Sequence, residues 1–148
     1  MDLKAQVGED LKTAMKSRDK LKVSTLRLLL SEIKNAEIAK RGELDESETD
    51  AVVAREARKR REAIEEFAKA GRQDLVDKET AELEILSGFL PEQVPEDELR
   101  GLIDQAIEEV GAASPKDLGK VMSVLMPRVK GKADGKAVNR LVREALGG

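Results

Sequence analysis

Apolar residues recur every three or four positions along almost the whole chain, and this spacing restricts it to helices. Residues 20–40 carry Leu26, Leu29, Leu30 and Ile33 at the spacing of one buried helix face. The same spacing predicts helices at about residues 2–17, 47–70 and 73–90. No segment alternates apolar and polar residues as a strand does, and good helix formers dominate. We therefore expect an all-α fold that begins with four long helices.

The pattern changes after two prolines, Pro91 and Pro95, that bracket a short stiff connection. Three further apolar stripes follow, over residues 99–110, 118–129 and 138–146, and predict a compact three-helix bundle. We place the domain boundary near residue 94, between an N-terminal helical domain (1–94) and a C-terminal domain (95–148). Pro127 is expected to kink or stop the middle helix of the bundle around Met126, because proline does not fit a helix interior.

Several residue types are absent, and their absence narrows the chemistry. The chain has no Cys, His, Trp or Tyr. Without Cys there can be no disulfide, and without Cys and His there can be no zinc site built on thiolate or imidazole. The absence of His also removes the commonest general base near neutral pH. We expect no catalytic centre, no metal site and no cofactor. The N-terminus lacks the apolar core of a secretory signal and no segment is apolar enough to cross a membrane, which favours a cytoplasmic protein without a membrane partner.

Charge is nearly balanced overall but unevenly distributed in the C-terminal part. The formal net charge is −3, yet residues 95–113 hold six acidic side chains and one basic one, whereas residues 114–148 hold eight basic and three acidic ones. This leaves two interpretations open: a positive face that neutralises phosphates, or a mixed surface in which the acidic helix screens the basic ones. The candidate nucleic-acid-binding residues are Lys120, Arg128, Lys130, Lys132, Lys136 and Arg140.

The segment from Lys130 to Lys136 combines positive charge with the expected start of the last helix. The first N–H groups of a helix lack internal partners and can hold a phosphate, which makes Gly131, Asp134 and Gly135 the loop and cap of a candidate anion site. The alternative is a plain helix–helix turn in which Gly131 is the C-cap and Asp134 the N-cap. Both can hold together.

A second basic cluster lies in the third predicted helix, whose ends can also be predicted. Its residues are Arg55, Arg58, Lys59, Arg60 and Arg61. Because acidic residues follow at helical spacing, a solvated, salt-bridged helix face is the favoured interpretation. Ser47 or Thr49 is the expected N-cap of this helix, Gly71 its C′ residue, and Gly42 the break before it.

Aromatic content limits how RNA could be bound. Phe67 and Phe89 are the only aromatic residues, so the chain can stack few bases of a single strand on aromatic rings. RNA contacts would be to backbone, 2′-OH groups and folded shape.

Several motifs together resemble the YqeY family over essentially the whole chain. They are residues 27–33 (RLLLSEI), 61–67 (REAIEEF), 70–75 (AGRQDL), 89–91 (FLP), 119–122 (GKVM), 126–127 (MP) and 130–136 followed by Val138-Asn139. The family is similar to the C-terminal tail of GatB, the B subunit of the glutamine-dependent tRNA amidotransferase. That enzyme amidates Glu-tRNA(Gln) or Asp-tRNA(Asn), and its tail helps to hold the tRNA while chemistry occurs in a separate domain. The resemblance implies binding of tRNA or other structured RNA around Lys130, Lys132, Asp134, Lys136 and Arg140, and it supplies no active site.

Three hypotheses follow. The first is a stand-alone module that binds structured RNA. The second is an accessory subunit that docks on an amidotransferase or an aminoacyl-tRNA synthetase through an apolar helix face. The third is an independent enzyme related to carbon–nitrogen ligases with glutamine as amido donor, for which Glu79 and Glu82, beside residues 72–74, are the candidate carboxylates. These acids also suit a plain role near the start of a helix.

Overall fold

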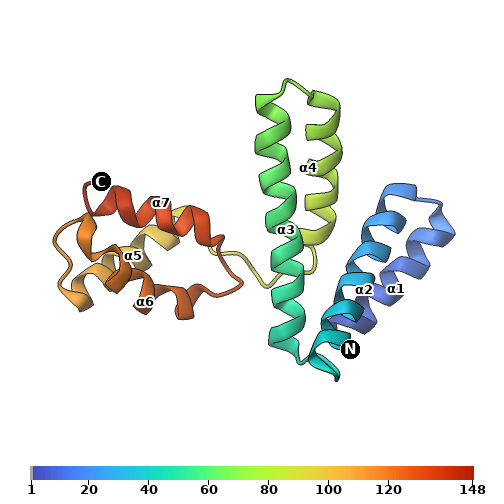
Figure 1. Ribbon diagram of the computed structural model, residues 1–148, viewed down its shortest axis with the longest axis horizontal. Coiled ribbons are helices and arrows are strands. Elements are labelled where there is room, and N and C mark those ends of the chain that lie inside the picture. Colours follow the sequence, from blue (N-terminus) through green and yellow to red (C-terminus); the bar gives the residue numbers. More distant parts are fainter. Residues whose placement is uncertain (1) are drawn as a thin grey trace. The chain divides into compact units, whose positions relative to one another are not determined.

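The computed structural model describes residues 2–148 and confirms the all-α fold. Over these residues the chain forms seven α-helices and one short 3-10 helix, and no strand is present in the described part (Figure 1). None of the helices in this range combines the length and apolarity needed to span a membrane. The chain divides into two compact units, the first ending at Leu90 and the second running from Pro91 to Gly148.

The first unit consists of two antiparallel helical hairpins. Helices α1 (Leu3–Ser17) and α2 (Lys20–Lys40) form one hairpin, and α3 (Glu46–Lys69) and α4 (Gln73–Ser87) form the other (Figure 1). Their shared core contains the stripe predicted on α2, with Leu26, Leu29 and Ile33 fully buried against residues of the other helices. The remaining core members are Val7, Val52, Val53, Leu86 and Phe89.

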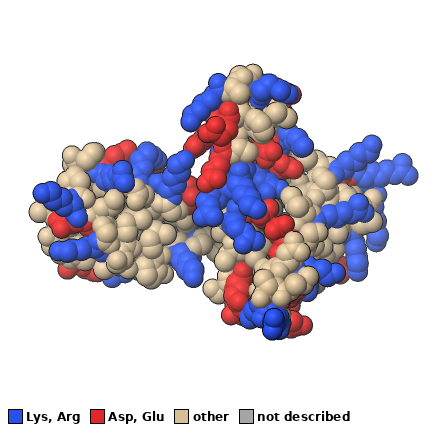
Figure 2. Space-filling view, in the orientation of Figure 1, with Lys and Arg blue, Asp and Glu red and all other residues tan. Residues whose placement is uncertain are grey.

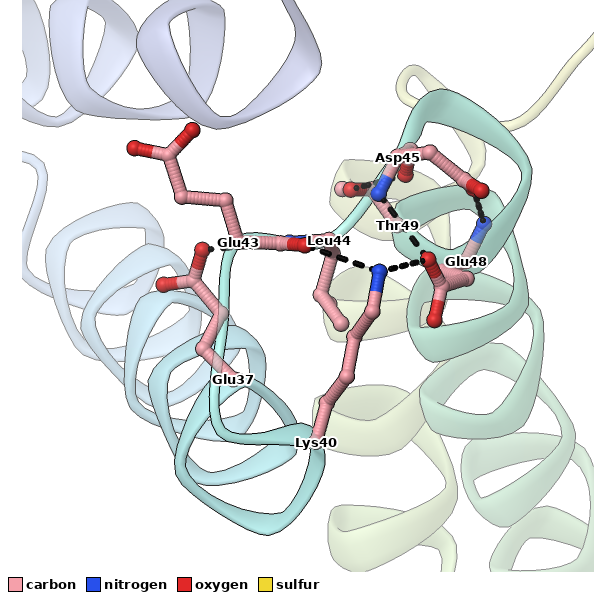
Figure 3. A network of polar contacts seen from close by, with 7 residues as sticks. All are labelled: Glu37, Lys40, Glu43, Leu44, Asp45, Glu48 and Thr49. Carbon is pink, nitrogen blue, oxygen red and sulfur yellow. Dashed lines mark hydrogen bonds and ion pairs between the residues drawn. The ribbon is translucent and has the colours of Figure 1, made fainter.

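The connection between α2 and α3 differs from the sequence prediction at both ends. Arg41, not Gly42, takes the left-handed conformation that ends α2, with φ of 64°. The N-cap of α3 is Asp45 and not Ser47 or Thr49: the Glu48 N–H donates to Asp45 Oδ1 at 2.8 Å and the Asp45 N–H donates to Glu48 Oε1 at 3.1 Å (Figure 3). This reciprocal pair satisfies two N–H groups at once, which a single hydroxyl cannot do.

Lys40 stabilises the same connection from the end of α2. Its ammonium group donates to the carbonyl oxygen of Glu43 at 2.9 Å and pairs with the Glu48 carboxylate (Figure 3). The pKa of Lys40 is raised, chiefly by the hydrogen bond to Glu48. One side chain therefore joins the last turn of α2 to the first turn of α3.

The second unit is a bundle of α5 (Glu96–Val110), α6 (Leu118–Val129) and α7 (Gly135–Ala145), with a 3-10 turn (Pro115–Asp117) before α6. Its core is formed by the three predicted apolar stripes. The unit begins at Pro91, four residues before the expected domain start at residue 95. This segment is tied to the bundle, because the Val94 N–H donates to the Lys132 carbonyl at 2.8 Å.

Pro127 does not stop α6, so of the kink or stop expected around Met126 the stop was wrong. The helix continues to Val129, which is fully buried together with Leu125. Burial of Val129 extends the apolar stripe by one turn, and Pro127 itself lies on the exposed side. The proline removes only the bond that would reach the Ser123 carbonyl, where water has access.

Candidate nucleic-acid interface

The loop between α6 and α7 is anchored through its backbone. Helix α6 ends at Val129 with Lys130 as its C-cap, and Gly131 follows with φ of +75°, a left-handed conformation that favours glycine. The Lys132 N–H donates to the Val129 carbonyl at 2.8 Å, and Gln93 Nε2 donates to the Gly131 carbonyl at 2.9 Å. The predicted C-cap at Gly131 is therefore displaced by one residue, with Gly131 in the position after the cap.

This anchoring presents two lysines to solvent. Lys130 and Lys132 flank Gly131, and both are exposed. Neither side chain forms an ion pair or hydrogen bond with any residue of the range 2–148. Lys136 is exposed as well and lies in the first turn of α7. The loop thus holds the lysines in place without neutralising Lys130 and Lys132.

The start of α7 fits both interpretations of this segment. Asp134 occupies the N-cap position expected for a turn, and its carbonyl accepts the first helical hydrogen bond from Val138 at 2.9 Å. Its carboxylate, however, accepts no capping hydrogen bond from the first turn of α7, which begins at Gly135. The Asp134 side chain therefore does not cap the first N–H groups of α7.

Among the predicted cations, Arg128, Arg140 and Lys120 lie close to carboxylates in the described part of the chain. Arg128 on α6 contacts Glu109 on α5 at two points, 3.1 Å and 2.6 Å, which raises the pKa of Arg128 and lowers the pKa of Glu109. Arg140 lies 3.4 Å from Glu144 and 3.7 Å from Glu96. The third is Lys120, 3.8 Å from Asp117. For these three, the acidic helix and its neighbours screen the basic ones.

The basic cluster of α3 is not a solvated face throughout, which corrects the sequence interpretation. Arg60 is only 8% exposed, and its Nη1 atom donates to Glu56 Oε1 at 2.9 Å. Glu56 is buried as well, and its second oxygen lies 3.1 Å from Lys59 Nζ. The signal was available in the sequence, since Arg60 continues the apolar positions Val53 and Ala57 at helical spacing.

The candidate carboxylates of α4 are neighbours of this buried pair. Glu82 Oε2 lies 3.9 Å from Arg60 Nε. The pKa of Glu79 is raised, first by burial and then by the charge of Glu82. Arg72 is occupied separately by Asp74, at 3.1 Å and 3.0 Å. Glu82 therefore serves a structural ion cluster between α3 and α4.

Fold and site together define an all-helical protein of two units that displays two unneutralised lysines on an anchored loop. The chain belongs to the YqeY family, whose model, described as Yqey-like protein, matches residues 4–146.

Curated relatives support this assignment. A protein of Pyrenophora tritici-repentis named "Altered inheritance of mitochondria protein 41, mitochondrial" is 33% identical over 93% of this chain and 77% of its own length. Proteins of the same name from Lachancea thermotolerans and Kluyveromyces lactis are 37% and 35% identical, over 78% and 90% of this chain and 63% and 70% of their own lengths. The name places these relatives in mitochondria and contradicts the expected cytoplasmic location. That expectation rested on the lack of a secretory signal, which cannot separate these compartments.

Proposed function

We propose that this protein is an accessory module that binds structured RNA, with tRNA as the ligand, and has no catalytic centre of its own. One observation carries the proposal: Lys130 and Lys132 are exposed on an anchored loop and have no ion pair within residues 2–148. Pairing with phosphates would neutralise them. The choice of tRNA rests on the resemblance to the amidotransferase tail.

The chemistry of the loop suits the RNA backbone. Two ammonium groups two residues apart can each neutralise a phosphate, and the uncapped start of α7 favours an anion nearby. Such contacts fix orientation but do not read bases. Binding should therefore follow RNA shape and weaken steeply with salt.

The test reverses two positive charges near the C-terminal end of α6 and compares the effect on tRNA affinity with that of two charge reversals near its N-terminal end. Lys130→Glu with Lys132→Glu alters the loop after Val129. The matched control is Lys116→Glu with Arg143→Glu: Lys116 precedes α6, and the Arg143 carbonyl accepts from the Gly148 N–H at 2.8 Å, with Gly148 next to Pro115. Both control residues are exposed and have no ion pair in the described part of the chain.

We expect the loop variant to bind tRNA at least about tenfold more weakly in filter binding. The slope of log K against the logarithm of the salt concentration should become smaller in magnitude by about 2. The control should keep most of its affinity. Equal loss in both variants would indicate a general charge effect, and unchanged affinity in the loop variant would refute the proposal.

A second candidate function, docking on an amidotransferase or an aminoacyl-tRNA synthetase, needs an exposed helix face with apolar character. Helix α2 supplies such a face. Carbon–nitrogen ligase activity gains no comparable support, since Glu82 faces the buried Arg60.

A further inference from the structure

A row of basic side chains runs along the outer face of α2. Lys20, Arg27, Lys34 and Arg41 follow one another at intervals of seven residues. Seven residues span about two turns and about 10.5 Å of a helix, so Lys20, Arg27 and Lys34 line up on one side of α2. Arg41 follows at the left-handed C-cap of the helix. We call these four residues the basic row. Sequence reasoning missed it, although the regular spacing was visible.

The basic row is not neutralised within the protein. All four side chains are exposed, and none forms an ion pair with another residue in the described part of the chain. Arg18, at the turn between α1 and α2, adds a fifth cation of the same kind. Figure 2 shows Lys and Arg side chains projecting from the part of the molecule that the α1–α2 hairpin forms. Some other cations of this unit, such as Arg55, have carboxylate partners.

Apolar side chains accompany the basic row. Large hydrophobic residues are exposed at only three places in residues 2–148, and all three belong to the α1–α2 hairpin. Two of them are on α2: Leu28 is 42% exposed and Ile38 is 69% exposed. Exposure of this size, on a helix whose opposite face is fully buried, indicates that the outer face has an apolar component of its own.

A depression connects the two kinds of side chain. It has a volume of about 570 Å³ and lies between Arg27 and Leu28, with the small residues Ser24 and Ser31 in its wall. The full lining is Arg18, Lys20, Val23, Ser24, Arg27, Leu28 and Ser31. Small residues beside a large one let another helix approach closely and seat one side chain in the gap.

We propose that the outer face of α2 docks an acidic amphipathic helix of a partner protein. Carboxylates at seven-residue spacing on that helix would face the basic row, and an apolar side chain would enter the depression beside Leu28. The spacing of about 10.5 Å between the basic side chains favours a helix over RNA, because neighbouring phosphates of one RNA strand are closer together than that. Phosphates would also make no apolar contact with the exposed Ile38. A second copy of this face is disfavoured, since it would oppose like charges.

The probe is a synthetic helical peptide of about 21 residues, three heptads long, with Glu at every seventh position beside a Leu stripe. A shuffled peptide of the same composition keeps the charge and loses the pattern. We would add each peptide to the full-length, ¹⁵N-labelled protein and follow the amide signals. The patterned peptide should shift signals of α2 between Lys20 and Arg41, and the shuffled peptide should bind at least about tenfold more weakly.

Variants separate charge from apolar packing. Arg27→Glu with Lys34→Glu should weaken peptide binding about tenfold or more, and Leu28→Ser should weaken it by a smaller factor. The matched control is Arg58→Glu with Lys78→Glu, two exposed cations of the α3–α4 hairpin without ion pairs in the described part. It should bind as the wild type does.

Several outcomes would overturn the proposal. These are no shifts at about 1 mM peptide, shifts outside α2, or equal binding of the shuffled peptide. If the patterned peptide fails while Arg27→Glu with Lys34→Glu reduces tRNA binding, the face contacts RNA instead. If α2 signals depend on protein concentration alone, the occupant is a second copy. The variants of Lys130 and Lys132 should not change peptide binding to α2. Failure of the peptide-docking proposal can therefore be distinguished from failure of the RNA-binding proposal.

Discussion

Arg128 on α6 and Glu109 on α5 bind each other at two points, with Nη1–Oε1 at 3.1 Å and Nη2–Oε2 at 2.6 Å. The carboxylate of Glu109 offsets the charge of a cation that lies only two residues before Lys130. It therefore sets how many positive charges the end of α6 offers to a polyanion.

Glu109→Gln should raise the affinity for tRNA, because Arg128 then keeps its charge without a carboxylate partner. The matched control is Glu108→Gln, the same change at the neighbouring exposed position, which has no ion pair in the described chain. Filter binding at one fixed salt concentration makes the comparison. If both variants gain affinity equally, net charge and not the release of Arg128 is responsible.

Arg60→Met should destabilise the first unit by about 3 kcal/mol, because it leaves the buried Glu56 with only the exposed Lys59 as a cationic neighbour. Adding Glu56→Leu should recover a large part of the loss, since the double variant replaces the pair by apolar side chains. Urea unfolding followed through NMR signals of α3 and α4 measures both. A double variant as unstable as the single one would contradict this account.

Glu79→Gln should stabilise the first unit at pH 7 and leave it nearly unchanged near pH 4. Burial raises the pKa of Glu79 in the folded state above the value of about 4.5 in the unfolded chain. Below that value both states are protonated and no penalty exists. As pH rises through the folded pKa, the folded state pays for ionisation, so stability falls.

Unfolding of the wild type and of Glu79→Gln at the two pH values measures this effect. Glu84→Gln, at an exposed position of the same helix, is the control. Equal pH dependence in all three proteins would remove the assignment to Glu79.

Gly131→Ala should destabilise the second unit by about 1 kcal/mol, because φ of +75° is strained for any residue with a Cβ atom. Gly101→Ala should do the opposite by a similar amount: it lies inside α5, with nothing within 4 Å of the added Cβ. Thermal unfolding of the two variants tests the contrast. The same sign in both would show that loop geometry is not what Gly131 provides.

Periodicity predicted the helices well, because burial of one face dictates where apolar residues recur. The stripe of Leu26, Leu29 and Ile33 and the three stripes of the second unit all lie in the cores. Local rules failed where tertiary contacts decide. Helix α6 continues beyond Pro127 because Val129 is buried in the core. Arg60 is buried because α3 packs against α4.

The candidate site was predictable only in part, since charge can be counted in a sequence but ion pairing cannot. Nothing local distinguishes Arg128, which has a carboxylate partner from another helix, from Lys130, which has none among residues 2–148. The partners of Arg128 and of one contact of Arg140 come from α5, far away in sequence. Only the packed bundle determines which cations remain available.

The hydrogen bond from Gln93 to the Gly131 carbonyl has a practical meaning for engineering. The peptide that leads in from the first unit and the turn that carries the lysines share one scaffold. Shortening or replacing residues 91–94 in order to separate the units would release that turn as well, so a truncated fragment beginning at α5 is a poor surrogate for the intact molecule.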